Sequence, residues 1–277
     1  MPALPALWMT LLPAQKAPDV ANIPTPQATV EQMLELAGVT SADAVYDLGC
    51  GDGRIVITAA KLRGARGVGV DLDPACVRQS QENARAAGVE HLVRFRREDL
   101  FRTDLSQATV VTLYLLPELN LRLRPRLLAR LRPGARVVSH VYDMGDWKPD
   151  KEAPAKGSRR YKVYCWTVPA RVDGWWRWTA RTPAGVQSDM LVLRQRHQNV
   201  EGELRAAGRA LAIRAGRMDG ASLRAEAASR EGVVIRIEAS VQGGRLSGRL
   251  EASSGLLEGS HAFEARREKG PGDEGGR

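Results

Sequence analysis

The stretch VYDLGCGDGR at residues 45–54 decides the fold. Apolar and aromatic residues lead to the acid Asp47, glycine then recurs at every second position, and IVITAA follows with the composition of a helix. Alternating glycines let backbone N–H groups approach a ligand that a Cβ would block, and they adopt positive φ angles without strain. The stretch therefore predicts a strand, a tight turn and a helix, with a ligand-binding site at the turn.

The strand–helix pattern continues on both sides of this turn. Apolar runs predict strands at 44–48, 66–72, 91–96, 109–115 and 136–141. Helical spacing predicts helices at 25–37, 54–62, 73–87 and 117–131. Thr25 is expected to cap the first helix, with Pro26 at its first position, and Pro125 is expected to kink or split the last one. This alternation predicts an α/β fold with a doubly wound, Rossmann-like sheet.

The second half of the chain has a different pattern. Residues 149–160 are polar and predict a loop, whereas 161–168 alternate as one more strand of the first sheet. Beyond about residue 172 roughly eight short alternating segments follow, which predicts a small antiparallel all-β barrel or sandwich. The predicted organisation is an irregular leader at 1–24, an α/β domain at 25–170, an all-β domain at 171–268 and a disordered tail at 269–277.

Composition limits the class of protein. A hydrophobic share of 43% is enough for a packed core. The net charge of +9 favours anionic partners, but the basic residues are spread along the chain without an aromatic-interleaved motif for nucleic acid. Three cysteines and four histidines have no paired spacing, which predicts neither a disulfide framework nor a metal site. The sequence carries no signal for oligomeric state.

The N-terminal stretch MPALPALWMTLLPAQ is apolar, but it is too short to span a membrane. It has no basic residue before Lys16, unlike a secretion signal. No transmembrane segment is visible elsewhere. A loose arm on a cytoplasmic protein and the remnant of a signal on an exported protein both remain open.

Acids lie at the ends of two further predicted strands. Asp71 follows Gly49 by 22 positions, close to the spacing of about 20 for an acid that binds ribose hydroxyls. Asp99 and Leu100 are placed to offer an adenine ring one polar and one apolar contact. Because ligands of parallel α/β sheets bind at the carboxyl ends of strands, these residues predict an adenosine site.

Two adenosine cofactors then compete for this site. A dinucleotide fold requires G-x-G-x-x-G, but the spacing here is G-x-G-x-G and position 54 is arginine. Asp47 and Asp52 would also repel a pyrophosphate. A cofactor with an amino group and a sulfonium suits these acids better, which favours S-adenosylmethionine.

Several segments carry a family resemblance. DLGCGDGR and GVDLDP resemble motifs I and II of the class I S-adenosylmethionine-dependent methyltransferases. Together with TPQATVEQML, VVTLYLLPELN and RVVSHVYDMGDW, they resemble bacterial relatives of the mitochondrial protein-lysine methyltransferases that modify the ATP synthase c subunit and the adenine nucleotide translocase. The resemblance covers about residues 22–168 and leaves the predicted β domain outside.

The resemblance implies a role for each matching residue. The cofactor-binding residues would be Thr25, Asp47, Gly49, Cys50, Gly51, Gly53, Asp71, Leu72, Asp99 and Leu100. Residues bordering the transferring methyl would be Tyr114, Leu115, Leu116 and Pro117. Tyr114 is the candidate catalytic residue, because its phenol can accept a hydrogen bond from a lysine amine.

Some residues and functions keep a second interpretation. His140, on an apolar strand, is expected to be a strand-end or core histidine and not a base. A set of tryptophans is expected in the β-domain core or at the joint between domains: Trp166, Trp175, Trp176 and Trp178. The leading function is N-methylation of protein lysine. The alternatives are methylation of a small molecule in a pocket shaped by the β domain, and a non-catalytic module that binds the cofactor and acts through that domain.

Overall fold

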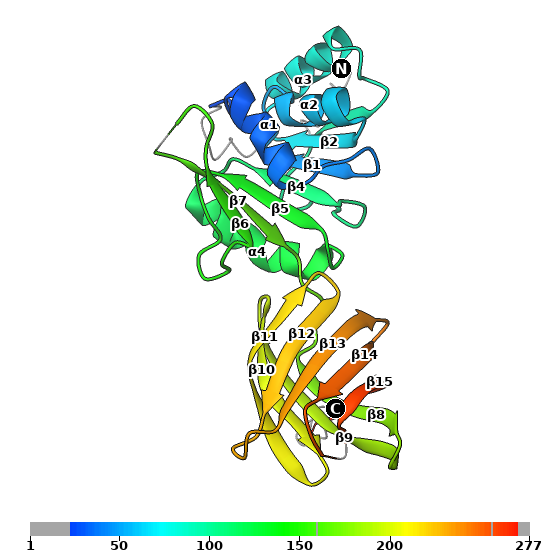
Figure 1. Cartoon of the computed structure of the whole chain (residues 1–277). Helices are drawn as coiled ribbons and strands as arrows, with labels where there is room; N and C mark the ends of the chain where they lie inside the picture. Colours follow the sequence, from blue (N-terminus) through cyan, green and yellow to red (C-terminus); the bar gives the residue numbers. More distant parts are fainter. Residues whose placement is uncertain (1–22, 159, 256, 271–277) are drawn as a thin grey trace, which may run out of the picture.

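The computed structural model describes residues 23–158, 160–255 and 257–270. The predicted leader before Ile23 and the predicted tail after Gly270 lie outside the described residues. The chain forms a seven-stranded sheet flanked by helices and, after it, a closed eight-stranded barrel (Figure 1). The α/β prediction is confirmed, and of the two all-β alternatives the barrel is the one observed.

The first sheet has the strand order β3-β2-β1-β4-β5-β7-β6, in which β1 to β5 are parallel. Its strands are β1 (Ala44–Leu48), β2 (Arg66–Asp71), β3 (Val93–Arg97), β4 (Val110–Leu113), β5 (Arg136–His140), β6 (Lys151–Pro154) and β7 (Lys162–Thr167). The helices are α1 (Gln27–Leu36), α2 (Arg54–Arg63), α3 (Pro74–Ala86) and α4 (Pro117–Arg130). Strands β6 and β7 are antiparallel, so the predicted strand at 161–168 extends the sheet as expected.

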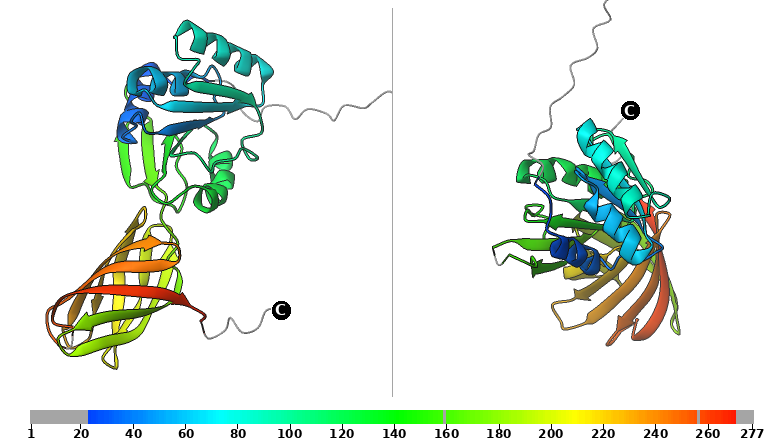
Figure 2. Two further views of the ribbon diagram at one scale, coloured as in Figure 1. Left: turned by 90° about the vertical axis from the view of Figure 1, so that its right-hand side faces the viewer. Right: turned by 90° about the horizontal axis from the view of Figure 1, so that it is seen from above.

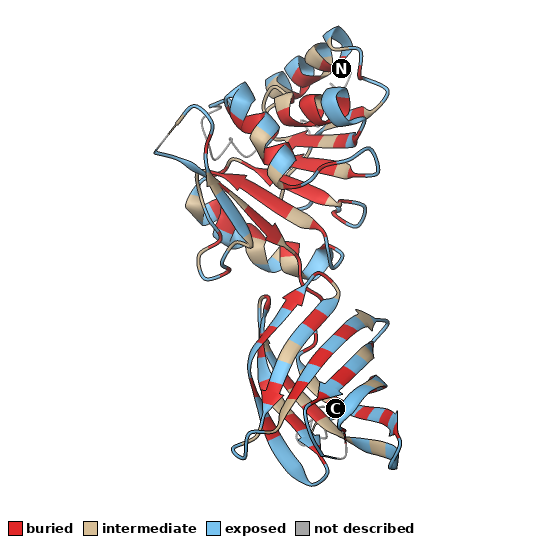
Figure 3. Cartoon of the chain, viewed as in Figure 1, coloured by how far each residue is buried: buried red, intermediate tan, exposed pale blue. Residues whose placement is uncertain are grey.

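Both faces of the sheet are covered, which explains why its central strands are apolar throughout (Figure 3). Side chains of α1, α2 and α3 pack on one face, in a cluster that includes Val30, Ile55 and Ala84. Leucines of α4 pack on the other face with Trp147 and Trp166. The sheet is therefore the middle layer of a three-layer sandwich.

Two local predictions are wrong, and one of the two outcomes expected at Pro125 is excluded. Thr25 does not cap α1, because the helix begins at Gln27 and the carbonyl of Pro26 accepts its first backbone hydrogen bonds. Pro125 does not split α4: it lies on the exposed side of a continuous helix, where water can satisfy the carbonyl that has lost its partner. Residues Lys151–Pro154, predicted as loop, form the edge strand β6, whose outer side tolerates charge and proline.

The barrel is closed in the order β10-β11-β12-β13-β14-β15-β8-β9. Its strands are β8 (Gly174–Thr182), β9 (Gly185–Arg196), β10 (Asn199–Ala206), β11 (Arg209–Asp219), β12 (Ser222–Ala228), β13 (Val234–Gln242), β14 (Arg245–Ala252) and β15 (Gly259–Glu268). Buried and exposed residues alternate along them, as Figure 3 shows, because every strand has one face inside the barrel.

The predicted tryptophan set divides between the two parts. Trp176 and Trp178 fill the barrel, and their indole N–H groups donate to backbone carbonyls. Trp166 lies in the α/β part and donates to the carbonyl of Trp147. On the outer surface of the barrel, arginines form ion pairs with glutamates of neighbouring strands, as in Arg177–Glu268 and Arg236–Glu226. Residues 171–268 contain no lysine, so the cationic side chains of the barrel exterior are arginines.

The barrel contacts the first sheet at the end where β5 begins (Figures 1 and 2). The carbonyl of Gly220 accepts from the N–H of Ala170 at 2.7 Å, and Gly220 lies against Gly134, just before β5. Arg217 forms an ion pair with Asp150, just before β6. These contacts place the barrel at the amino ends of the parallel strands. Among the described residues, no helix has the length and apolar character needed to cross a membrane.

Candidate active site

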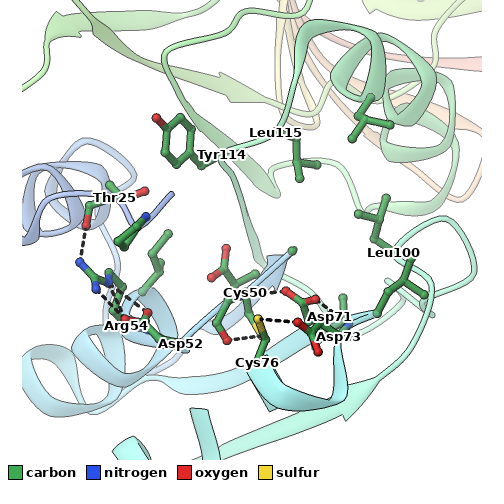
Figure 4. Close-up of a pocket in the computed structure, with 18 of the residues that line it drawn as sticks. Thr25, Cys50, Asp52, Arg54, Asp71, Asp73, Cys76, Leu100, Tyr114 and Leu115 are labelled. Atoms are coloured by element: carbon green, nitrogen blue, oxygen red, sulfur yellow. Dashed lines mark hydrogen bonds and ion pairs between the residues drawn. The ribbon is translucent and has the colours of Figure 1, made fainter. Parts of the chain in front are cut away.

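A cavity of about 290 Å³ lies at the carboxyl ends of β1, β2, β3 and β4. Strands β2 and β4 pair with opposite sides of β1, so the cavity lies where the strand order reverses. Figure 4 shows Tyr114 and Leu115 on the opposite side of it from Asp71 and Cys76, with Thr25 and Arg54 at one end and Leu100 at the other. Every described residue of its lining precedes residue 120, so the barrel contributes none of them.

The glycine turn is built differently from the sequence-based expectation. Its N–H groups bond within the protein: those of Gly49 and Cys50 donate to the carbonyl of Val70, and that of Gly51 donates to Asp71. They are therefore engaged and do not form the anion-binding cradle that a pyrophosphate requires. This geometry supports the choice against a dinucleotide.

The glycines themselves are required for conformation and packing. Gly49 has φ +88°, and a Cβ on it would lie 3.0 Å from Leu115, which lines the cavity. Gly53 has φ +78° and precedes α2; a Cβ there would lie within 2.7 Å of both Phe95 and Ser80. Gly53 does not line the cavity, so its contribution is to let α2 approach α3 and β3 closely.

The cavity is acidic although the protein is basic overall. Among its described lining residues the carboxylates are Asp47, Asp52, Asp71, Asp73, Glu98 and Asp99. Arg54 is the cation among those same residues, and the whole chain has a net charge of +9. A concentration of carboxylates in a cleft selects a cationic ligand. A sulfonium cofactor with an amino group and two ribose hydroxyls therefore fits these residues.

Asp47 is the most buried of these acids. It lies on β1, is 3% exposed and accepts a hydrogen bond from Thr112 Oγ1 at 2.7 Å. Burial raises the pKa of Asp47 to about 7; the Thr112 hydrogen bond opposes the rise, and repulsion from Asp71 and Asp52 adds to it. A bound cation would favour the ionised form of this carboxyl group.

Asp71 is held by the backbone around it. Its two oxygens accept from the N–H groups of Gly51, at 3.0 Å, and Asp73, at 2.9 Å. Asp73 in turn caps α3 by accepting from Ala75 N at 2.8 Å. The orientation of the Asp71 carboxylate is thus set by the turn on one side and the helix start on the other.

Arg54 links the glycine turn to the segment before α1. Its guanidinium pairs with Asp52 and donates to the carbonyl of Thr25 at 2.9 Å. Burial pushes the pKa of Asp52 up, but the hydrogen bonds and charge of Arg54 outweigh it, so that pKa is lowered. The pair holds Thr25 at the cavity wall.

The remaining wall consists of apolar and phenolic side chains. Tyr114 directly follows β4, and burial raises the pKa of its phenol, with Tyr142 and Tyr161 adding to the rise. Leu115 is buried behind Gly49. This wall carries no charge, in contrast to the acidic floor.

Most of the residues expected at the site do line the cavity: Thr25, Asp47, Gly49, Cys50, Gly51, Asp71, Leu72, Asp99, Leu100, Tyr114 and Leu115. Gly53, Leu116 and Pro117 do not. Leu116 is exposed at the start of α4, and Pro117 is the first residue of that helix. Burial raises the pKa of the Cys50 thiol, as expected for a small neutral filler.

Sequence reasoning used Asp52 as an acid of the site but gave it no binding role, and it missed these lining residues: Ile23, Pro24, Arg54, Ile55, Val70, Asp73, Cys76, Glu98, Phe101 and Leu119. Asp52 and Asp73 were visible as acids next to the motif residues, and the D-x-R spacing of Asp52 and Arg54 indicates a local ion pair. The contact of Arg54 with Thr25, 29 positions away, has no sequence signal.

A reversed strand order, an acidic cleft and a glycine turn whose N–H groups at Gly49, Cys50 and Gly51 bond within the protein together indicate the class of a Rossmann-like S-adenosylmethionine-dependent methyltransferase. Comparison with known proteins agrees. Residues 47–151 match the model of the ANTKMT methyltransferase domain.

Three relatives place the chain further. It is 40% identical over 153 residues to a protein-lysine N-methyltransferase of Saccharolobus islandicus, an alignment that covers 54% of this chain and 95% of that protein. It is 33% identical over 138 residues to the Xenopus laevis lysine N-methyltransferase of the ATP synthase c subunit, covering 50% of this chain and 60% of that one. It is 54% identical to a solved RNA methyltransferase of Salinibacter ruber in complex with S-adenosyl-L-homocysteine, covering 54% of this chain and 96% of that one at a TM-score of 0.52.

The chain belongs to the family of S-adenosylmethionine-dependent methyltransferases that includes these enzymes. It is an enzyme whose cofactor is S-adenosylmethionine. The alternative of a non-catalytic module is thereby set aside.

Proposed function

We propose that the enzyme methylates lysine amino groups of a protein. The observation that supports this most is the contrast within one cavity, which has an acidic floor suited to a cationic cofactor and an uncharged wall at Tyr114 and Leu115. The names of the Saccharolobus and Xenopus relatives point to the same acceptor. The chain spans only 60% of the Xenopus enzyme, so we do not propose the ATP synthase c subunit as its acceptor.

We assign the cofactor-binding roles as follows. Asp47, with Gly49, Cys50 and Gly51 around it, would hold the amino-acid end of the cofactor. Asp71 and Leu72 would bind the ribose, and Asp99 and Leu100 the adenine. Thr25 would cover the methionine part, and Gly53 would act only by letting α2 pack closely.

When bound, the cofactor supplies an electrophilic methyl group on a sulfonium. The protein has to place a neutral amine in line with it. A lysine with a free pKa of about 10.4 must first lose a proton. Leu115 would lower that pKa by excluding water, and the phenol oxygen of Tyr114 would accept a hydrogen bond from the amine. Tyr114→Phe is expected to lower the rate of methyl transfer; full activity in this variant would remove Tyr114 from the mechanism.

A second candidate acceptor is RNA, because the solved relative at 54% identity is described as an RNA methyltransferase. Against it stands the sequence Tyr114-Leu115-Leu116-Pro117, which differs from the (N/D)-P-P-(Y/F) motif of adenine and amide N-methyltransferases. The small-molecule alternative loses its main support, since no described residue of the barrel lines the cavity.

The test is methyl-labelled S-adenosylmethionine incubated with the enzyme and a host-cell lysate. Label that survives ribonuclease, is released by protease and elutes as methyl-lysine after acid hydrolysis is the expected result. Label that is lost with ribonuclease would assign the enzyme to RNA. Label in small molecules alone would exclude both macromolecules.

We further propose that residues 25–170 and 171–268 are separate folding units. The Saccharolobus relative supports this, because 153 residues of this chain cover 95% of it. We also propose that the enzyme works in the cytoplasm, where its cofactor is made. N-terminal sequencing of the native protein tests this, and a start within or after the apolar leader would favour export instead.

A further inference from the structure

Three aromatic rings form a continuous row beside the cavity. Tyr114 follows β4, His140 is the last residue of β5, and Tyr161 directly precedes β7. The ring centroids of Tyr114 and His140 are 4.5 Å apart, and those of His140 and Tyr161 are 6.3 Å apart. Register explains the row, because Leu113 pairs with Ser139 and His140 pairs with Val163.

The row leads from the cavity to the surface. Tyr114 lines the cavity, His140 is 3% exposed and Tyr161 is 38% exposed. Tyr161 is thus one of the large hydrophobic side chains that the described part of the protein leaves open to solvent. An acceptor side chain approaching Tyr114 from outside could follow these rings.

The row is uncharged. Burial lowers the pKa of His140 to about 4, so its imidazole is neutral near pH 7, in keeping with the expected strand-end role. Its Nδ1 is buried without a hydrogen-bond partner among the described residues. Burial also raises the pKa of Tyr114, which keeps the phenol protonated.

The exposed ring of Tyr161 already contacts a cation, the guanidinium of Arg160. The guanidinium carbon of Arg160 lies 5.9 Å from the centroid of Tyr161. Within this distance a ring face attracts ammonium and guanidinium groups. The row therefore suits an alkylammonium side chain in two ways. Its charge is attracted to the ring faces, and its aliphatic stem packs against an uncharged wall. A phosphate group has neither property.

We propose that Tyr161 and Tyr114 line the acceptor route, with the ring of His140 buried between them. The lysine side chain enters along Tyr161 and presents its nitrogen at Tyr114, while His140 is a positioning residue that holds the Tyr114 ring. This inference rests on the proposed lysine acceptor and adds Tyr161 as a specificity residue and His140 as a positioning residue, neither of which the family resemblance placed at the site.

The first experiment measures the initial rate of methyl labelling against the concentration of a host-cell protein extract cleared of RNA. Tyr161→Ala is expected to raise the half-saturating extract concentration about two- to fivefold at unchanged maximal rate, because an exposed cation–π contact is worth about 0.5–1 kcal/mol. Tyr161→Phe keeps the ring and is expected to match the wild type. Val186→Ala, which alters an exposed side chain of the barrel, is the matched control. An unchanged half-saturating concentration in Tyr161→Ala overturns the route.

The second experiment compares His140→Ala with His140→Phe. Loss of the ring is expected to lower the maximal rate by about ten- to a hundredfold through displacement of Tyr114. His140→Phe keeps a neutral ring and is expected to stay within about twofold of the wild type. Calorimetric affinity for S-adenosylmethionine, expected to be the same in both variants, separates this effect from misfolding. If both variants lose activity to the same extent, the imidazole nitrogens are essential. If both variants keep wild-type activity, the ring has no function. Either result overturns the positioning role.

The failure of this inference is distinguishable from failure of the proposed function. If the wild type labels no lysine in the extract, the function itself is wrong. If it labels lysine while the Tyr161 and His140 variants behave as the wild type does, only the route is wrong.

Discussion

The two ends of the first sheet carry opposite kinds of structure. At the carboxyl ends of its strands the chain places the buried Asp47, a set of half-buried acids around it and the uncharged wall of Tyr114 and Leu115. At the amino ends it places Pro133, Gly134 and the contacts with the barrel. Turns at one end of a parallel sheet can change without disturbing the other end, which is why chemistry and attachment can be separated in this way. No described residue of the barrel lines the cavity, so the difference supports the proposal that the barrel is attached to the α/β part as a separate unit.

The largest effect is expected from a glycine of the active-site end. Gly53→Ala adds a Cβ within 2.7 Å of Phe95 and Ser80 at φ +78°, so strain and overpacking together should cost about 2–5 kcal/mol of unfolding free energy. Gly243→Ala in a barrel turn has φ +55° but open space around it, and should cost about 1–2 kcal/mol. Urea unfolding of both variants measures the contrast, and equal costs would show that φ alone decides.

The next effect concerns the cofactor. Asp71→Asn keeps the shape of the side chain but removes the charge that two backbone N–H groups orient. Because a hydrogen bond to a charged group contributes about 1.5–3 kcal/mol, the affinity for S-adenosylmethionine should fall about ten- to a hundredfold. The matched control is Asp150→Asn, at the barrel contact, which should leave the affinity unchanged. A loss in the control would mean that the two ends of the sheet are coupled.

A smaller effect is expected from pH. The free enzyme holds Asp47 with a pKa of about 7, and a bound cation lowers that pKa, so binding requires a carboxyl group that is protonated below pH 7 to lose its proton. Affinity for S-adenosylmethionine should therefore level off about one unit above this pKa and fall up to about tenfold per unit as the pH drops below it. Calorimetry from pH 5.5 to 7.5 measures this trend. The trend should vanish in Asp47→Asn, and its persistence there would assign it to another group.

The smallest effect is expected from removal of the barrel, which tests the comparison between the two ends of the first sheet most directly. A chain ending at residue 170 lacks the barrel but keeps every described residue that lines the cavity. Its affinity for S-adenosylmethionine should stay within about twofold of that of the full chain. An unfolded product or a large loss of affinity would contradict the proposed division into two folding units.

Sequence patterns predicted the parallel sheet because its buried strands are apolar throughout, and they predicted the site because acids and glycines cluster at strand ends. They missed β6, whose residues KEAP are polar and include a proline. They also carried no information on how Gly53 packs or on which groups accept the hydrogen bonds of the turn N–H groups. A sequence shows that glycine is present, but only the fold shows that Phe95 fills the space beside Gly53 and that Val70 and Asp71 accept the turn's hydrogen bonds.

The barrel was predictable only in outline for the same kind of reason. Alternation with period two tells that one face of each strand is buried, but a sandwich and a barrel share that pattern. Closure depends on the pairing of β8 with β15, whose partner residues Phe263 and Ala180 are far apart in the sequence. Long-range pairing of this kind leaves no local pattern.

The arginine–glutamate exterior of the barrel has a consequence for the methylation assay itself. An enzyme that labels lysine also risks labelling its own surface, but residues 171–268 contain no lysine. Under the proposed function, any label on the enzyme must therefore lie in the terminal segments or in the α/β part, whose lysines are Lys61, Lys148, Lys151, Lys156 and Lys162. Tryptic peptides of the barrel therefore serve as an internal negative control. A methylated peptide from this region would indicate an acceptor other than lysine.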